Sequence, residues 1–201
     1  MKNIIVGQSG GPTAVINSSL LGVFKTAKDR GADIVYGMVH GIKGLLDRNI
    51  VDLSKHIKND LDMDLLKRTP SSFLGSCRYK LPDIEGNEDV YEKIFEILNE
   101  LEIYAFFYIG GNDSMDTIKK LSDYGLKINS PIRFIGVPKT IDNDLAITDH
   151  TPGYGSAAKY IAATMQEIIR DCAVYTVPAV TIVEIMGRDA GWLTAAAALP
   201  R

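Results

Sequence analysis

The sequence predicts an α/β fold: a Rossmann-like, mostly parallel sheet flanked by helices. Short apolar runs alternate along the chain with segments whose apolar residues recur at helical spacing, which is typical of βα units. Glycine-rich junctions fall between an apolar run and the helical segment after it. Loops in that position are where parallel sheets bind their ligands, so the same pattern indicates where to look for a site.

The first part of the chain opens the alternation. Residues 3–7 are a short apolar run and the first predicted strand. Apolar residues then recur at helical spacing over residues 16–27, and Gly31 stands where a helix C-cap is expected. Residues 33–38 are the second predicted strand. Residues 41–90 mix glycine, proline and charge, so loops with short helices are expected there.

The second part continues the pattern. A helix over residues 94–101 leads into residues 104–109, a continuous apolar run typical of a strand buried on both faces. A further helix is predicted over residues 115–121, with Gly125 as its stop, and residues 133–137 are the next strand. The remaining predicted elements are an amphipathic helix at residues 161–172, a strand at 180–185 and a helix that opens within 189–199.

Composition bounds the kind of protein. The 201 residues are 46% hydrophobic and 23% charged, which is enough apolar mass for a substantial core. The net charge is −3 and no basic run occurs, so a nucleic-acid partner is not expected. No apolar stretch reaches the roughly 18 residues of a membrane span, and the N-terminus resembles a strand rather than a signal peptide. A cytoplasmic protein without a membrane partner is therefore expected. Cys77 and Cys172 lack metal-ligand spacing and are interpreted as structural thiols.

The most informative segment is residues 137–144, Val-Pro-Lys-Thr-Ile-Asp-Asn-Asp, which follows a predicted strand. Asp142 and Asp144 flank Asn143, so an extended loop would point both carboxylates the same way, one as a base and one as a metal partner. Lys139 adds a compact cation suited to phosphate. Together these groups suggest phosphoryl transfer to a hydroxyl. The alternative is an Asx turn that carries solvated charges.

Two glycine-rich loops are candidates for anion binding. Residues 7–14, Gly-Gln-Ser-Gly-Gly-Pro-Thr-Ala, join the first strand to the first helix, where backbone N–H groups can bind an anion. This loop is neither a P-loop nor a Gly-x-Gly-x-x-Gly fingerprint, and the alternative is a plain tight turn. Residues 109–115, Ile-Gly-Gly-Asn-Asp-Ser-Met, repeat the arrangement at a second strand end. Ser114 in this loop could instead be only an N-cap.

Three other loops carry weaker signals. Residues 151–158 offer Gly-x-Gly-x-x-Ala, but no adequate strand precedes them, so a dinucleotide fingerprint is rejected and a role in holding the acidic loop is expected. Gly187 lets the backbone approach a ligand, and the planar guanidinium group of Arg188 can bind phosphate or carboxylate through two hydrogen bonds. Taken alone, Arg188 is better interpreted as an ordinary surface salt-bridge residue, and Arg78, in a glycine-serine loop, shares that ambiguity.

The motifs Gly-Gly-Pro-Thr, Gly-Gly-Asn-Asp-Ser, Pro-Lys-Thr-Ile-Asp-Asn-Asp, Thr-Pro-Gly-Tyr-Gly-Ser-Ala and Met-Gly-Arg, in this order, closely resemble the phosphofructokinase family. The resemblance spans essentially all 201 residues. It implies the phosphofructokinase fold with an incomplete second domain, because family chains continue past residue 201. Residues 1–145 would be a phosphoryl-donor-binding domain and residues 146–201 part of a sugar-phosphate-binding domain. The implied protein is a homo-oligomeric glycolytic transferase that phosphorylates the 1-hydroxyl of fructose 6-phosphate.

The resemblance also implies residue roles. Asp142 would accept the proton of the sugar hydroxyl, with Thr140 beside it, and Arg188 would contact phosphate. Lys139 and Arg78 would supply charge opposite the developing negative charge on the donor. The implied donor-binding residues are Gly11, Arg78, Gly111, Asn112, Asp113 and Ser114. The implied sugar-phosphate residues are Thr140, Asp142, Asp144, Met186, Gly187 and Arg188.

Two positions indicate the phosphoryl donor, and a third bears on the metal. ATP-dependent members resemble this chain but carry glycine where it has Asp113 and Lys139. A carboxylate at Asp113 would repel a nucleotide α-phosphate, while Lys139 can neutralise free pyrophosphate, so pyrophosphate is expected and ATP is the alternative. Asn112 stands where many members have a metal-binding aspartate. Magnesium is therefore expected through Asp113, Asp144 or the donor itself.

A third possibility is a non-catalytic module that retains only phosphate affinity. Asp142 argues against it, because a binding module has no need of a carboxylate that repels phosphate. Ala179 occupies the position where bacterial ATP-dependent enzymes place an arginine that reaches a neighbouring subunit. That contact between subunits is accordingly not expected here.

Overall fold

The computed structural model describes residues 2–199. The chain divides into two compact units, the first ending at Lys139 and the second beginning at Thr140. Among the described residues, no helix combines the length and the apolar character needed to cross a membrane.

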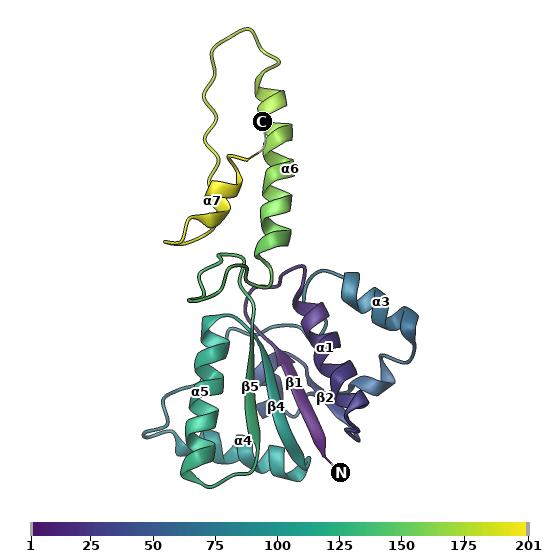
Figure 1. Cartoon of the computed structure of the whole chain (residues 1–201). Coiled ribbons are helices and arrows are strands. Elements are labelled where there is room, and N and C mark those ends of the chain that lie inside the picture. The colour runs from purple at the N-terminus through teal and green to yellow at the C-terminus, as the bar shows by residue number, and fades with distance from the viewer. Residues whose placement is uncertain (1, 200–201) are drawn as a thin grey trace. The chain divides into compact units, whose positions relative to one another are not determined.

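Unit 1 is built on a five-stranded sheet with the strand order β3-β2-β1-β4-β5 (Figure 1). Strands β1, β2, β4 and β5 run parallel, and β3 is antiparallel to β2. The mostly parallel α/β sheet predicted from the sequence is therefore confirmed. The strands are β1 (Asn3–Gln8), β2 (Val35–Met38), β3 (Ile50–Asp52), β4 (Ile103–Gly110) and β5 (Arg133–Pro138).

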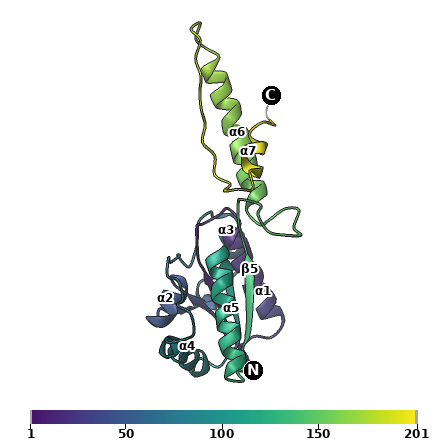
Figure 2. The same ribbon diagram turned by 90° about the vertical axis from the view of Figure 1, so that its left-hand side faces the viewer.

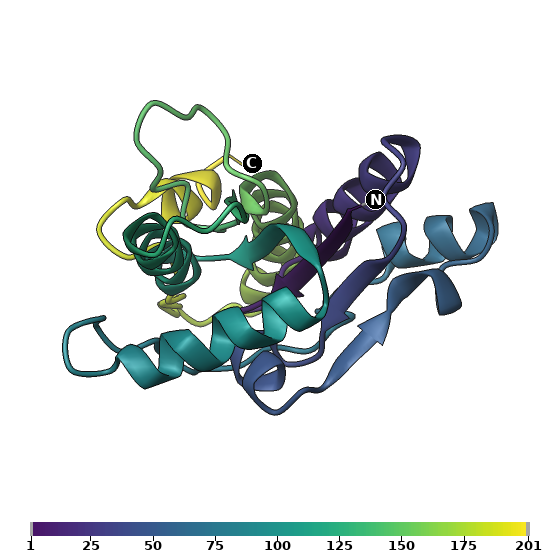
Figure 3. The same cartoon turned by 90° about the horizontal axis from the view of Figure 1, so that it is seen from below.

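Helices cover both faces of this sheet because its strands present apolar side chains to both sides. Ile5 packs into a core with α2, α4 and α5, whereas Val6 packs into a second core with α1 and α3. Figure 2 shows α5 lying along β5, and Figure 3 shows α1 and α4 on opposite faces of the strands. The helices of unit 1 are α1 (Ile16–Asp29), α2 (Gly41–Leu46), η1 (Leu53–Lys55), α3 (Asp60–Arg68), α4 (Glu88–Glu100) and α5 (Asn112–Lys127).

Helix ends follow backbone chemistry, and one expected stop was wrong. Gly31 has φ +79°, and the amides of Gly31 and Ala32 close α1 in a Schellman motif. Gly125 does not end α5: it lies within the helix, where an added Cβ would stand 3.2 Å from Phe134. Asn129, with φ +53°, takes the left-handed position after this helix. Gly125 is thus a packing residue, and asparagine supplies the stop.

Unit 2 contains α6 (Tyr154–Cys172) and α7 (Trp192–Ala196), which lie side by side (Figures 1 and 2). The strand predicted at residues 180–185 was wrong. Residues 176–187 have neither helix nor strand, and Val180 and Ile182 are 90% and 91% exposed. A strand needs a hydrogen-bonded neighbour, and no other described segment pairs with this one. The last helix begins at Trp192 rather than Asp189, after Gly191 with φ +70°.

Candidate active site

The carboxyl ends of three neighbouring strands bring the glycine-rich loops of unit 1 together. Gln8 on β1 is in register with Ile109 on β4, and Gly110 is in register with Pro138 on β5. Beyond the strands, the Ser9 amide donates to Ile109 O at 2.9 Å, and the Lys139 amide donates to Gly110 O at 3.0 Å. The two predicted anion loops and Lys139 therefore share one edge of the sheet.

Lys139 is held against both loops. Its side chain is only 6% exposed. A Cβ added to Gly10 would stand 3.3 Å from Lys139 Nζ, and one added to Gly111 would stand 3.9 Å from it. Gly10 also has φ +78°, so glycine is required there for backbone conformation as well as for the space beside the ammonium. A buried cation next to two backbone loops fits a small polyanion.

The loop after β4 is shaped by its serine. Gly111 is the N-cap of α5, so Ser114 is the third residue of the helix and not its cap; that alternative was wrong. Ser114 is 3% exposed and packs beneath Gly110, where an added Cβ would collide with its Oγ and stand 2.6 Å from its Cβ. The glycine lets the loop close over the serine. The Ser114 amide donates to Gly111 O at 3.0 Å. The amides of Asn112 and Asp113, the first two of α5, have no acceptor within the helix and are placed to donate to an anion.

Asn112 and Asp113 begin α5 and are exposed. They border an open hollow of about 510 Å³ that is also lined by Lys120, further along α5, and by Asp83. Lys120 Nζ lies 2.8 Å from Asp83 and 3.0 Å from Asp116, and these hydrogen bonds raise its pKa. The ion cluster ties α5 to the irregular segment before α4. The full lining is Lys80, Leu81, Pro82, Asp83, Asn112, Asp113, Asp116 and Lys120.

Arg78 is exposed on an irregular segment that borders the loop after β1. Just before it, Ser76 Oγ donates to Gly10 O at 2.7 Å, and Ser9 Oγ donates to Cys77 O at 3.1 Å. Burial alone would raise the pKa of the Cys77 thiol. Hydrogen bonds outweigh burial and leave that pKa below its ordinary value; they come from the backbone of Tyr79 and Lys43 and from the side chains of Ser9 and Tyr108. Arg78 thus directly follows residues that are hydrogen-bonded to the glycine-rich loop after β1.

In unit 2, Thr140 organises the acidic loop. Its Oγ1 accepts a hydrogen bond from the Asp142 amide at 3.0 Å and donates to Asp144 Oδ1 at 3.1 Å. Asn143 between the two carboxylates is left-handed, with φ +56°. The expectation of an extended loop with parallel carboxylates was therefore wrong. The loop is a turn, but one nucleated by a threonine hydroxyl rather than an Asx side chain.

The Asp142 carboxylate is largely withdrawn from water. Its side chain is 14% exposed, and Arg188 Nε lies 3.7 Å from its Oδ2. Its Oδ1 is buried and, among the described residues, has no hydrogen-bond partner. Buried polar atoms are nearly always paired, so an unpaired carboxylate oxygen marks a place where a ligand can donate. The alternative of solvated charges does not describe Asp142, although it does describe the exposed Asp144.

Asn143, to which sequence reasoning assigned no role, and Thr151 together hold this loop. The buried Asn143 donates to Asp149 O at 3.0 Å and accepts from the Thr151 amide at 2.9 Å, and Thr151 Oγ1 donates to Thr140 O at 2.8 Å. Residues 151–158 therefore do hold the acidic loop, as predicted. Near Arg188, Gly187 is buried with φ +148°, and Met186 is 71% exposed.

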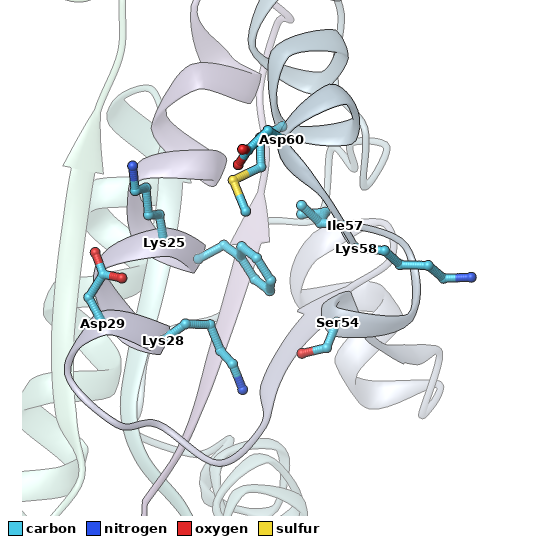
Figure 4. A pocket seen from close by; sticks show the side chains of 9 residues that line it. Lys25, Lys28, Asp29, Ser54, Ile57, Lys58 and Asp60 are labelled. Atoms are coloured by element: carbon cyan, nitrogen blue, oxygen red, sulfur yellow. The ribbon is translucent and has the colours of Figure 1, made fainter.

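A second hollow, of about 450 Å³, lies between α1, η1 and α3 (Figure 4). Lys25, Lys28 and Lys58 stand around it with Asp29 and Asp60. No predicted site residue lines it, so it is separate from the glycine-rich loops.

The acidic side chains form no ready-made metal cage. Within residues 2–199, no three His, Cys, Asp or Glu side chains cluster as a metal site. Asp113 in unit 1 and Asp144 in unit 2 each offer one exposed carboxylate. Single carboxylates fit Mg²⁺, which commonly keeps several waters and takes further oxygens from a bound phosphate. They do not fit a metal held by protein ligands alone.

A parallel α/β sheet with glycine-rich loops at the carboxyl ends of β1 and β4 defines the class of proteins that bind ligands at that edge. Within this class, the sequence profile described as Phosphofructokinase matches residues 3–201. The chain belongs to the phosphofructokinase family.

Three relatives illustrate its place in that family. The chain is 46% identical over 197 residues to the pyrophosphate–fructose 6-phosphate 1-phosphotransferase of Rhodospirillum rubrum, covering 98% of this chain and 46% of that protein. The crystal structure of a pyrophosphate-dependent phosphofructokinase from Nitrosospira multiformis superposes with a TM-score of 0.90 at 42% identity, covering 98% of this chain and 49% of the other. An ATP-dependent 6-phosphofructokinase of Edwardsiella ictaluri is 36% identical over 199 residues, covering 99% of this chain and 57% of that protein. The chain thus spans about half the length of the relatives it matches.

Proposed function

We propose that the protein carrying this sequence transfers a phosphoryl group from pyrophosphate to the 1-hydroxyl of fructose 6-phosphate, giving fructose 1,6-bisphosphate in glycolysis. The observation that carries the proposal is the buried ammonium of Lys139 beside Gly10 and Gly111. A point charge there suits a compact donor with no nucleoside. Support also comes from relatives named as pyrophosphate-dependent enzymes at 42–46% identity, against 36% for an ATP-dependent one.

The proposed reaction needs few protein groups. The 1-hydroxyl oxygen attacks one phosphorus of pyrophosphate, the bond from that phosphorus to the bridging oxygen breaks, and inorganic phosphate leaves. Asp142 takes the proton that the hydroxyl loses, which suits a carboxylate with a buried, unpaired oxygen. Lys139 and Arg78 offset negative charge that develops on the donor oxygens.

The remaining assignments belong to the same proposal. Gly11, Gly111, Asn112, Asp113 and Ser114 would line the donor in unit 1, while Thr140, Asp144, Met186, Gly187 and Arg188 would serve the sugar phosphate from unit 2. Mg²⁺, when bound, would neutralise donor charge, and Asp113 or Asp144 would each supply one oxygen ligand. We further propose a homo-oligomer acting in the cytoplasm.

The test is a calorimetric titration of the protein with pyrophosphate and, separately, with ATP, both in the presence of Mg²⁺. Tighter binding of pyrophosphate is expected. Preference for ATP would favour the ATP-dependent alternative. Pyrophosphate binding without any turnover of fructose 6-phosphate would favour a non-catalytic phosphate-binding module.

A further inference from the structure

The segment that carries Arg78 is unusual in having no regular structure of its own. Residues 69–87, between α3 and α4, contain neither helix nor strand. Connections of this length inside a compact unit are uncommon and usually functional. Their backbone groups find no partners in a regular helix or sheet, so side chains, other loop backbone or water must satisfy them. Arg78 is exposed, so its placement depends on what fixes the backbone around it.

Gln8, the last residue of β1, fixes the first part of this segment. Its side chain is fully buried, at 0% exposure. Gln8 Oε1 accepts from the Leu74 amide at 2.8 Å, and it shares the single proton of Ser72 Oγ, at 2.9 Å, with Gly75 O at 2.6 Å. Its Nε2 donates to Ile16 O at 3.1 Å and to Asn17 Oδ1 at 3.0 Å. Both ends of this buried amide are therefore hydrogen-bonded, and its oxygen contacts the irregular segment through Ser72 and Leu74.

Asn17, in the first turn of α1, completes the network. It is 1% exposed. Asn17 Oδ1 accepts from the Phe73 amide at 2.9 Å, and its Nδ2 donates to Thr69 O at 2.9 Å. The two buried amides therefore bond to each other and to Thr69, Ser72, Phe73 and Leu74.

The network continues directly into the glycine-rich loop after β1. Leu74 is also bonded through its carbonyl to the His40 amide at 2.7 Å. Two residues further on, Ser76 bonds to Gly10, and Cys77 bonds to Ser9. Gln8, Ser9 and Gly10 are consecutive, so one short stretch of chain both leads into the glycine-rich loop and holds the part of the irregular segment just before Arg78.

We infer that Gln8, acting with Asn17, is a positioning residue that sets Arg78 beside the glycine-rich loop and so helps the site to take pyrophosphate. The inference rests on the proposed function. Gln8 itself does not touch the donor: it is buried below the loop and acts through residues 72–78. An arginine on an anchored backbone is preorganised, whereas one on a relaxed loop must be ordered when the ligand binds.

The experiment compares the unsubstituted protein with Gln8→Met, which keeps side-chain length and removes both polar atoms. Pyrophosphate affinity is measured by calorimetry, and backbone hydrogen exchange is followed over residues 69–78. We expect pyrophosphate binding to weaken by about tenfold, because Arg78 and its loop must then be ordered when pyrophosphate binds. Affinity for fructose 6-phosphate stays unchanged. Exchange at Leu74 and its neighbours becomes faster.

Two further variants separate positioning from general damage. In the Arg78→Ala background, Gln8→Met should cause little additional loss of pyrophosphate affinity, because its effect passes through Arg78. Ser72→Ala removes one partner of Gln8 from a partly exposed site and should give a smaller change of the same kind. The matched control is Asn3→Leu at the opposite end of β1, where the Asn3 amide bridges Leu101 and Ile34. It should leave pyrophosphate affinity unchanged.

Unchanged pyrophosphate affinity in Gln8→Met, or fully additive losses in the double variant, would overturn the inference. Slow exchange over residues 72–78 in Gln8→Met would do the same. If the unsubstituted protein fails to bind pyrophosphate at all, the proposed function is contradicted, and the exchange measurement still decides whether Gln8 orders the segment.

Discussion

Asp142 is the residue whose surroundings bear most directly on chemistry. Its Oδ1 is buried and unpaired among the described residues, while Arg188 stands 3.7 Å from the other oxygen. An unpaired buried acceptor lowers stability, so its presence is more easily explained by a ligand than by folding. Sequence reasoning found Asp142 from its loop and from family resemblance. It could not find the left-handed Asn143 that sets the carboxylate's direction, because that conformation depends on the contacts of Asn143 with Asp149 and Thr151.

Replacing Asp142 with asparagine should lower turnover far more than it changes the Michaelis constants, because the group acts on the proton in transfer. General-base contributions are typically about 10²- to 10⁴-fold. Steady-state kinetics of the active protein with pyrophosphate and fructose 6-phosphate measure this. Asp149→Asn, an exposed aspartate of the same loop, is the control. An unchanged turnover number in Asp142→Asn would remove this residue from the mechanism.

Donor choice is predicted to reside in Asp113 and Lys139. Changing both to glycine removes the carboxylate at the start of α5 and the ammonium beside Gly10. The double variant should gain measurable ATP binding and lose pyrophosphate affinity, each read by calorimetry. A double variant that still binds only pyrophosphate would show that these two residues do not set the donor.

Cys77 gives a pH-dependent prediction at the same loop. Since the pKa of its thiol is lowered, the thiolate is populated at lower pH than in an unfolded peptide of the same sequence. The rate of alkylation by iodoacetamide should rise with pH and reach half its plateau at a lower pH than in the peptide. Cys172→Ser isolates Cys77 for the measurement. A half-plateau at or above that of the peptide would contradict the hydrogen-bonding account.

At the scale of elements, the strongly periodic segments were predictable and the context-dependent ones were not. The strands β1, β4 and β5 and the helices α1, α4, α5 and α6 all follow from local apolar patterns. The short β3 (Ile50–Asp52) exists only because it pairs with β2, and residues 180–185 lack such a partner despite their strand-like sequence. Pairing is a tertiary property, so local pattern could neither reveal the first nor reject the second.

Gly22, inside α1, and Gly31, just after its C-terminus, should respond in opposite ways to the same substitution. Among residues 2–199, no atom lies within 4 Å of a Cβ added to Gly22 or Gly31, so backbone conformation decides the sign of the stability change. Gly22→Ala, inside the helix, should raise the free energy of unfolding by about 0.5–1 kcal/mol. Gly31→Ala, at φ +79°, should lower it by about 1 kcal/mol. Urea denaturation checks both, and changes of the same sign would contradict the assignment of Gly31 as the cap.

At the scale of the whole molecule, the two units differ in how well they bury their apolar residues. Unit 1 has a core on each face of its sheet, whereas α6 has no buried residue. The family and the parallel sheet followed from the sequence, because five ordered motifs and the βα alternation are both local features. The exposure of residues 174–186 did not follow, since it depends on which other segments are present to cover them.

The 201-residue chain should therefore self-associate as its concentration rises, through the exposed apolar side chains within residues 174–186 of unit 2. Lysine at both Val180 and Ile182 should reduce this association, as measured by sedimentation velocity, because charges interrupt an apolar, unpaired segment. Ile147→Lys is the control, because Ile147 is also fully exposed but lies outside that segment. A chain that stays monomeric at all concentrations, or an equal effect of the control, would contradict this prediction.

The most direct test of the central claim is the donor dependence of turnover in the active protein. Formation of fructose 1,6-bisphosphate from fructose 6-phosphate is measured with Mg²⁺ and either pyrophosphate or ATP, with Asp142→Asn run alongside. We predict product with pyrophosphate, little with ATP, and loss of turnover in Asp142→Asn. Product formed efficiently with ATP and not with pyrophosphate would contradict the account.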